Sequence, residues 1–271
     1  MNKGIDLKEF LNKKVVEFNQ LSFIKNDPIS VPHLFTKKQD IEIAGFFAAI
    51  FAWGNRKTII RKSRELMERM DNSPYQFVLR HTEKDLSKLM GFKQRTFNET
   101  DLLYFIEFLK QHYSTHDSLE DAFLKIVPHS SSQPGGEGFV ESALAGFYKY
   151  FFSLEYIPPR TRKHIATPGK GSTCKRLNMY LRWMVRKDST GVDFGIWKNI
   201  PSSQLICPID LHVARVAKKL NLLRRKQIDW QAALELTDCL RKLDKADPVK
   251  YDFALFGLGA IEPGFIKSLK N

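Results

Sequence analysis

The sequence has few cysteines, no long apolar run and no signal-peptide pattern. Its three cysteines, Cys174, Cys207 and Cys239, form no CxxC pair, which argues against a disulfide framework, a zinc ribbon and a cysteine-ligated iron–sulfur cluster. The longest apolar run, 43–53, is too short to cross a bilayer. The first residues are too charged for the apolar core of a signal peptide. These absences predict a cytoplasmic protein with no metal site, no cofactor and no membrane association.

Alternating runs of β-branched residues joined by hairpin turns are also nearly absent, which argues against a sheet. Residues 40–52 are apolar almost all round, as is typical of a helix at the centre of a core. Residues 57–70 have one apolar face at helical spacing. Further helix starts are indicated by capping signals at Thr100, Ser118, Asp229 and Asp247. The sequence therefore predicts an all-α protein.

Two stretches rich in proline, glycine or serine, 129–138 and 156–171, are predicted to be loops. No internal repeat is present. We expect the 271 residues to form one unit of two helical lobes with a cleft between them. Residues 40–203 would form one lobe, and 1–39 together with 204–271 the other.

Basic residues exceed acidic ones by a wide margin. Forty-three Lys and Arg against thirty Asp and Glu give a net charge of +13. Nine of the basic residues lie in 160–187, a segment with no acidic residue. A charge run is often only a solvated face. A run that holds so much of the excess charge favours a polyanionic partner, above all nucleic acid.

The basic segment contains a glycine turn followed directly by a helix pattern. The turn, PGKG at 168–171, precedes a helix that Ser172 or Thr173 can cap, and such a helix start favours a phosphate group. On a helical wheel Lys175, Arg182 and Arg186 share one side, opposite an apolar side. We expect the basic side to face outward along a nucleic-acid backbone. The predicted DNA contacts are Gly169, Lys170, Gly171, Arg176, Arg182 and Arg186.

The next helix pattern, in 207–220, has an apolar face and an aspartate, Asp210, at its start. Aspartate is a common helix N-cap, which is the simplest role for this residue. A carboxylate at a helix start can also face a cleft while the backbone donors that it caps hold it in place.

Two motifs in this region resemble those of the helix-hairpin-helix DNA glycosylase superfamily. PIDLHVARV at 208–216 is similar to the Pro-Val-Asp-Thr-His-Val-x-Arg-Val motif, and PGKGSTCK at 168–175 resembles a variant of the Leu-Pro-Gly-Val-Gly-x-Lys hairpin. The whole chain resembles a bacterial family of uncharacterised proteins related to this superfamily, with the archaeal 8-oxoguanine glycosylases as the nearest characterised branch. The resemblance implies an all-α, two-lobed fold with a central DNA-binding cleft.

The resemblance also implies a DNA-repair glycosylase with AP-lyase activity, which excises a damaged base, expected to be an oxidised purine. Lys175 would attack the sugar C1′ and form a Schiff base, and Asp210 would stabilise the cationic sugar. Lys175 lies two residues beyond the motif's lysine position, where this sequence has Thr173. Lys170 is therefore a second candidate nucleophile.

In the archaeal enzymes an aspartate and an aromatic residue four positions later hold the flipped base. Asp252 and Phe256 match that spacing, although a phenylalanine at helical spacing from Phe253 is more often core, and Asp252 can instead pair with Lys250 or face solvent. Trp53, at the end of a buried helix pattern, is a third base-pocket candidate and can also be core. The implied partner is double-stranded DNA with a damaged base, bound by a monomer. The alternatives are a non-catalytic nucleic-acid-binding protein on the same fold, and a helical scaffold for an acidic protein.

Overall fold

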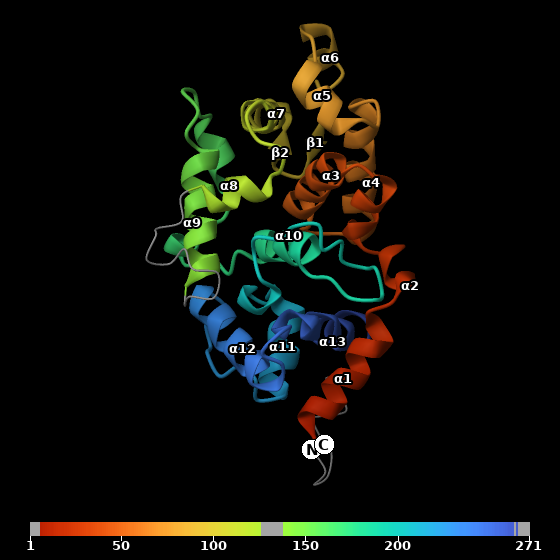
Figure 1. Cartoon of the computed structure of the whole chain (residues 1–271), viewed down its shortest axis with the longest axis vertical. Coiled ribbons are helices and arrows are strands. Elements are labelled where there is room, and N and C mark those ends of the chain that lie inside the picture. The colour runs from red at the N-terminus through yellow and green to blue at the C-terminus, as the bar shows by residue number, and fades with distance from the viewer. Residues whose placement is uncertain (1–5, 126–137, 263, 265–271) are drawn as a thin grey trace. The chain divides into compact units, whose positions relative to one another are not determined.

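The computed structural model describes residues 6–125, 138–262 and 264 (Figure 1). Helices dominate them, so the predicted all-α class is confirmed. The strands in these residues are β1 (Lys93–Gln94) and β2 (Phe97–Asn98), an antiparallel hairpin in which Gln94 pairs with Phe97. In the described part of the chain no helix combines the length and apolarity needed to span a membrane. The predicted loop at 129–138 lies outside the described residues except for Gly138.

The chain divides into two compact units. The composite unit comprises Met1–Phe23 and Thr167–Asn271, and the central unit comprises Ile24–Ala166. The expected lobe boundaries at 39/40 and 203/204 are therefore displaced: residues 24–39 belong with the central helices, and 167–203 belong with the C-terminal segment. Short turns explain the first shift, since the two 3₁₀ helices at 28–34 pack against α3 (Lys38–Phe51). The expected cleft stays a prediction.

The central unit is built around α3, whose residues 41–51 are all buried, as the apolar pattern predicted. Aromatic rings from neighbouring helices surround it: Phe46 stacks on Phe105 with centroids 5.6 Å apart, and Phe105 meets Phe151 at 4.7 Å. Such edge and stacked contacts add to the area that the rings bury. The elements after α3 in this unit are α4 (Arg56–Arg69), α5 (Pro74–Arg80), α6 (Glu83–Ser87), β1, β2, α7 (Glu99–Tyr113), α8 (Glu120–Leu124), α9 (Phe139–Phe151) and the 3₁₀ helix η3 (Pro159–His164).

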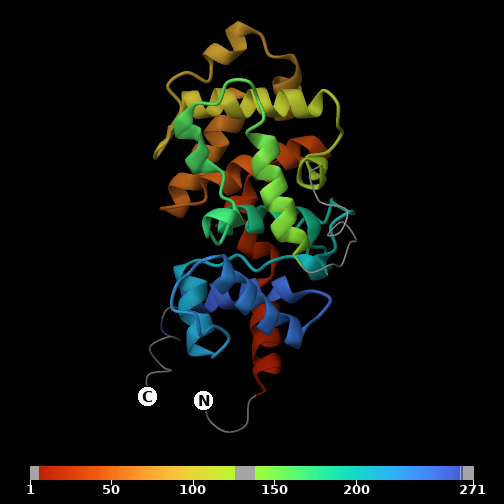
Figure 2. The ribbon, with the colours of Figure 1, turned by 90° about the vertical axis from the view of Figure 1, so that its left-hand side faces the viewer.

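The composite unit joins the two ends of the described chain. Helix α1 (Leu7–Phe18) packs across α13 (Tyr251–Phe256), as Figures 1 and 2 show. The contact is close because residue 257 is glycine: a Cβ there would lie 2.2 Å from the Phe18 ring. The other elements are α2 (Leu21–Ile24), which leads into the central unit, η4 (Pro168–Lys170), α10 (Lys175–Val185), η5 (Ser202–Gln204), α11 (Leu211–Lys219), α12 (Trp230–Leu243), η6 (Pro248–Lys250) and the π-helix η7 (Gly257–Ile261).

Some expected caps hold and others do not. Asp229 accepts a hydrogen bond from the Ala232 N–H and caps α12, as predicted. The expected cap of α7 at Thr100 is wrong, because the helix begins at Glu99 and Asn98 is its N-cap in a reciprocal capping box with Asp101. The box satisfies two backbone N–H groups at the start of α7. A threonine side chain inside the first turn would not satisfy them.

One carboxylate, Glu42 on α3, lies fully inside the aromatic core of the central unit. It accepts hydrogen bonds from the Tyr113 hydroxyl at 2.8 Å, the Ser118 hydroxyl at 2.6 Å and the Leu119 N–H at 3.1 Å. A buried charge is tolerated only when its oxygens are satisfied in this way. Glu42 therefore joins α3 to the end of α7 and to the segment that leads into α8.

We expect Glu42→Ala to lower the free energy of unfolding by about 3 kcal/mol or more, because three donors lose their buried acceptor. Chemical denaturation followed by circular dichroism measures this loss. The matched control is Glu107→Ala on the exposed face of α7, for which a change within about 0.5 kcal/mol is expected. Equal effects of the two substitutions would contradict the role given to Glu42.

Candidate active site

The glycine turn at 168–171, called here the hairpin turn, is exposed and anchored to the composite unit by its backbone. Residues 168–170 form η4, and Gly171 has a positive φ of 69°. The Gly171 carbonyl accepts a hydrogen bond from the Trp230 N–H, at the start of α12, at 3.2 Å. Gly169 and Lys170 are exposed on the turn. The hairpin turn therefore presents its outer side to solvent while α12 holds its inner side.

Helix α10 begins at Lys175, and its N-cap is not one of the residues that the sequence predicted. The N-cap is Cys174, with a left-handed φ of 50° and no side-chain cap, so the expected capping by Ser172 or Thr173 is wrong. The Ser172 hydroxyl instead accepts a hydrogen bond from the Cys174 N–H, one step before the helix. A non-glycine residue in this region carries strain, and such residues concentrate at functional sites.

Two side-chain hydrogen bonds fix the start of α10 relative to α11. The Asn178 amide donates to the Thr173 carbonyl at 3.0 Å, and the Thr173 hydroxyl donates to the Ile209 carbonyl at 3.4 Å. Ile209 directly precedes Asp210, the N-cap of α11. Thr173 therefore links the start of α10, where Lys175 lies, to the residue before Asp210.

The Lys175 amine and the Asp210 carboxylate come together. The Nζ atom of Lys175 lies 3.8 Å from Oδ2 of Asp210, which is an ion-pair distance and too long for a hydrogen bond. Oδ1 of Asp210 is held by the N–H groups of His212 and Val213 at 2.9 and 3.0 Å. The two side chains are 27% and 26% exposed. One carboxylate oxygen thus orients the group while the other faces an amine that a ligand can reach.

The expected outward-facing basic side of α10 is wrong for Arg182 and Arg186, which are only 4% and 2% exposed. The apolar side is buried too, at Leu177, Leu181 and Met184, so α10 is enclosed almost all round. The physical reason is a set of acidic partners that a helical wheel does not show. Both side chains are buried and bound to carboxylates, so the prediction that Arg182 and Arg186 contact DNA is wrong.

Each arginine holds more than one aspartate. Arg182 contacts Asp193 at 3.3 Å and donates a short hydrogen bond to Asp252. Arg186 contacts Asp188, Asp193 and Asp247 at 2.7, 3.0 and 2.9 Å. We call these six residues the ion cluster. The cluster has two cations and four carboxylates, so its formal charge is negative when all four carboxylates are ionised.

Burial is the main cause of the raised pKa values in the ion cluster. Burial raises the pKa of Asp252 to about 6, and the negative charge of Asp210 adds to the effect while Arg182 opposes it. Burial likewise raises the pKa of Asp247. Asp188 differs: burial opposes ionisation, but hydrogen bonds from Thr190 and Asn19 and the charge of Arg186 lower its pKa to about 2. Asp252 and Asp247 are therefore the two carboxyl groups of the cluster whose pKa is raised.

The predicted base-pocket residues do not form one site within either unit. Asp252 is buried and bound to Arg182, and Phe256 packs edge-on against Phe23 at 6.2 Å. Trp53 belongs to the central unit, where the Arg95 guanidinium covers its ring at 4.2 Å. The Asp252 carboxylate already accepts a hydrogen bond from Arg182, so its contacts do not favour a role in holding a base. The pocket as a whole stays a prediction.

Arg176, the remaining predicted contact on α10, is half-buried. Burial lowers the pKa of its guanidinium to about 10, which leaves it charged at neutral pH. Among the described residues no group of three or more His, Cys, Asp or Glu side chains could hold a metal ion.

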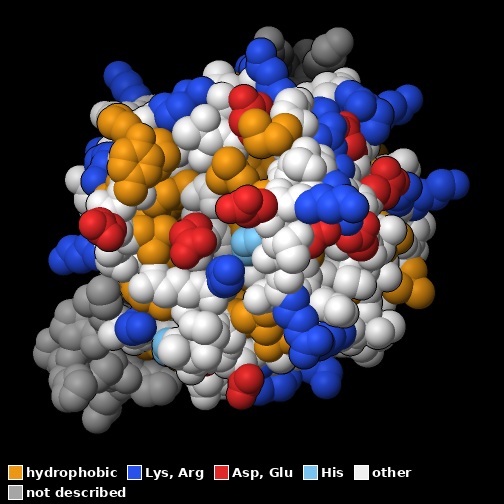
Figure 3. Space-filling view, turned by 90° about the horizontal axis from the view of Figure 1, so that it is seen from above, with side chains coloured by type: hydrophobic (Ala, Val, Ile, Leu, Met, Phe, Trp, Pro, Cys, Tyr) orange, Lys and Arg blue, Asp and Glu red, His pale blue; other side chains and the backbone are white. Residues whose placement is uncertain are grey.

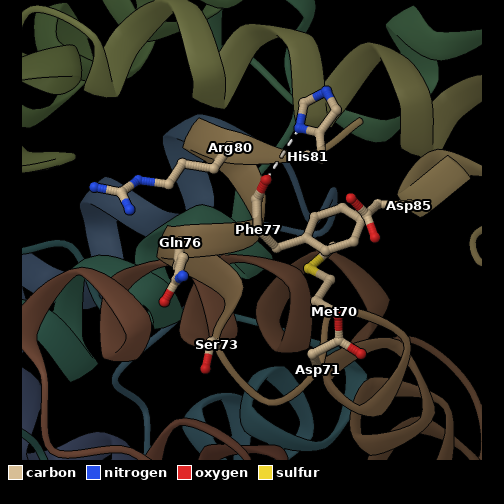
Figure 4. Close-up of a pocket in the computed structure, with 8 residues that line it drawn as sticks. All are labelled: Met70, Asp71, Ser73, Gln76, Phe77, Arg80, His81 and Asp85. Atoms are coloured by element: carbon tan, nitrogen blue, oxygen red, sulfur yellow. Dashed lines mark hydrogen bonds between the residues drawn. The ribbon is translucent and has the colours of Figure 1, made fainter. Parts of the chain in front are cut away.

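The central unit has a concave region of about 230 Å³ beside α5, shown in Figure 4. The Phe77 ring and the Met70 sulfur lie in the middle of the view, whereas the Arg80 side chain extends away from them. The His81 ring contacts the Phe77 carbonyl at 3.0 Å. The polar groups that line this concave region do not converge on one point. The region is therefore a weaker candidate for a binding site than the Lys175–Asp210 pair.

Comparison with known proteins places the chain in a family. A family model described as "Protein of unknown function (DUF2400)" matches residues 27–261. The chain belongs to this family. The match includes the hairpin turn, Lys175 and Asp210, but the family's description assigns no activity. No curated protein and no solved structure matches the chain.

The sequence did not predict the roles of three residues of the site: Cys174, Asn178 and Trp230. Asn178, four residues after Cys174, is a signal that sequence reasoning can use, because an amide one turn into a helix reaches back to the preceding loop. Trp230 holds the hairpin turn through its backbone N–H, a contact that any residue other than proline could make, so the residue type does not predict it. The left-handed Cys174 has none of the usual glycine or asparagine signals.

Asp252 should make the stability of the composite unit depend on pH. Because its folded-state pKa of about 6 exceeds the ordinary value of 3.8, the folded state takes up the proton first as the pH falls. Its contribution to stability therefore grows between pH 7 and 4, by up to about 3 kcal/mol, and is lost as the pH rises through 6. Asp252→Asn should abolish this component, measured as the difference between the two unfolding free energies at each pH.

The control for this titration is Asp188→Asn in the same cluster. The pKa of Asp188 is lowered to about 2, so its contribution is present above the ordinary value of 3.8 and is lost only as the pH falls through 2. The difference between wild type and Asp188→Asn should thus stay constant from pH 7 to 5. Parallel pH curves for wild type and Asp252→Asn would show that Asp252 is ionised throughout.

Proposed function

We propose that the chain is a DNA glycosylase with AP-lyase activity that acts on a damaged base in double-stranded DNA, with an oxidised purine as the favoured target. The observation that carries this proposal is the partly exposed Lys175–Asp210 pair with 3.8 Å between amine and carboxylate. The likeness of 168–175 and 208–216 to the glycosylase motifs supports it. The proposal describes a cytoplasmic monomer that needs no cofactor.

The pair has the groups that base excision by an amine requires. Asp210 accepts a proton from the Lys175 ammonium after a small movement of either side chain, or through one water molecule. The free amine then attacks C1′ of the sugar, and the bond from C1′ to the base breaks with its electron pair leaving on the base. Asp210 passes the proton that it took from Lys175 to the departing base, and the carboxylate that this regenerates stabilises the positive charge on the sugar. Loss of a proton from the attached nitrogen and opening of the sugar give the Schiff base.

The hairpin turn supplies the phosphate contact that this chemistry needs. Gly169, Lys170 and Gly171 are exposed beside the first turn of α10. Backbone N–H groups at a helix start and a neighbouring lysine favour a phosphate there. The target nucleotide must leave the base stack to reach the amine. A phosphate held at the hairpin turn would position its sugar near Lys175.

The alternative is a nucleic-acid-binding protein without catalysis. Lys175 stands two residues beyond the lysine position of the motif, and its amine pairs with a carboxylate rather than lying among cations. These two observations favour the alternative, which predicts DNA binding that survives Lys175→Gln and Asp210→Asn unchanged.

Borohydride trapping tests the proposal. Wild-type protein mixed with duplexes that carry 8-oxoguanine, other oxidised purines or an abasic site should form a covalent adduct. Lys175→Ala should abolish the adduct because the nucleophilic amine is gone. Asp210→Asn should slow base excision by about 10²- to 10⁴-fold, because proton transfer and charge stabilisation are both lost.

Lys170→Ala is the matched control, since it removes the second candidate amine from the same hairpin turn. It should weaken DNA binding and keep the adduct. Melting curves show whether each variant is folded. Absence of any adduct with wild-type protein on the whole panel would refute the enzyme, and an adduct lost in Lys170→Ala but kept in Lys175→Ala would assign the nucleophile to Lys170.

A further inference from the structure

Outside the basic segment 160–187, helix α4 of the central unit has the largest excess of basic over acidic residues among the described helices. Residues 56–69 contain six Lys or Arg and two Glu. Its apolar face is buried through Ile59, Leu66 and Met67, so the opposite face is directed to solvent. Arg61 shows this directly, with a side chain 68% exposed. In contrast to α10, this helix displays its cations.

These cations line a groove of about 510 Å³, called here the α4 groove. Four basic side chains contribute to it, Lys25 before the helix and Lys57, Arg61 and Arg64 along it, and all four are exposed. Two acidic residues, Glu65 and Glu68, also line it. Glu65 lies 3.7 Å from Arg61 of the groove, and it is held more closely by Lys62 at 2.6 Å and Arg69 at 3.0 Å, neither of which lines the groove. The groove therefore has a net positive lining.

We propose that the α4 groove binds the phosphate backbone of a nucleic acid, independently of sequence. This inference deepens the proposed function and rests on it only for the class of partner. Lys57, Arg61 and Arg64 follow one another at single helical turns over about 10 Å. One strand of a duplex offers a phosphate every 3.4 Å of its axis, so about three phosphates face this length. Guanidinium groups match phosphate oxygens in a bidentate way.

A phosphate backbone fits the groove better than an acidic protein does. Apart from the stems of its charged side chains, Ile60 is the apolar residue in the lining. Protein interfaces depend on a few buried aromatic or aliphatic anchors, for which this groove has no pocket. Figure 3, seen from above, shows Asp, Glu and apolar side chains together with some Lys and Arg in the middle of the view, and further Lys and Arg projecting around its edge. The α4 groove offers charge without anchors, which is the chemistry of backbone contact.

The experiment compares two triple variants of the full chain. The groove variant is Lys57→Gln, Arg61→Gln and Arg64→Gln. The control removes the same charge from exposed lysines of the central unit outside the groove, as Lys84→Gln, Lys93→Gln and Lys149→Gln. Fluorescence anisotropy with an undamaged labelled duplex gives Kd at a series of salt concentrations. The groove variant should bind about tenfold or more weakly at low salt, and its slope of log Kd against log salt should fall by about 2 to 3.

The control variant should keep the wild-type slope to within about 1, because scattered lysines make few phosphate contacts. Borohydride trapping at saturating protein separates this inference from the proposed function. An adduct in the groove variant, at wild-type level, is expected if both hold. If wild type traps nothing while the groove variant loses duplex binding, the groove inference stands and the glycosylase fails.

Two results would overturn the inference. One is a groove variant with the Kd and salt slope of wild type. The other is a groove that binds polyglutamate in preference to the duplex, with polyglutamate binding lost in the groove variant alone, which would assign the groove to an acidic protein. Melting curves of both variants confirm folding, which is expected because all six substituted side chains are exposed.

Discussion

Two arginines, Arg182 on α10 and Arg186 at the C-cap of that helix, determine how the composite unit is assembled. Arg182 binds Asp252 on α13, and Arg186 binds Asp247 before η6, so α10 is joined to the C-terminal segment through charge. Both also bind Asp193 in the segment after α10. Buried ion pairs contribute little net stability but penalise every arrangement in which a partner is lost. The ion cluster therefore selects one orientation of α10, and with it the position of Lys175 at the start of that helix.

The same helix performs two tasks at its two ends. Its C-terminal half is enclosed by acidic partners, whereas its first residue is partly exposed and faces Asp210. Thr173 and Asn178 tie the first turn to the backbone before α11. A side chain at the first position of a firmly held helix has less freedom than one on a loop, which suits a group that has to meet a carboxylate at a set distance. Strain at Cys174 is the cost of turning the chain into the helix there.

Local patterns in the sequence predicted more than distant ones did. The buried helix at 40–52, the apolar face of 57–70 and the caps at Asp210 and Asp229 depend on residues a few positions apart, and the structure has them. The proximity of Lys175 to Asp210 followed from resemblance to a known pair of motifs. The burial of Arg182 did not, because its partner Asp252 lies 70 residues away and a helical wheel treats every charge as solvated. The lobe boundaries failed for the same reason, since contacts between distant segments decide them.

The ion cluster also changes what the net charge means. The densest basic segment includes two cations that are neutralised within the composite unit, so its charge is not all available to a partner. The exposed cations along α4 keep their contact with solvent, and they lie about a hundred residues before the densest basic segment. A charge excess read from composition therefore predicts the class of partner but not the surface that meets it. Burial decides the surface, because only a cation that keeps contact with solvent can release the counterions of a polyanion when it binds.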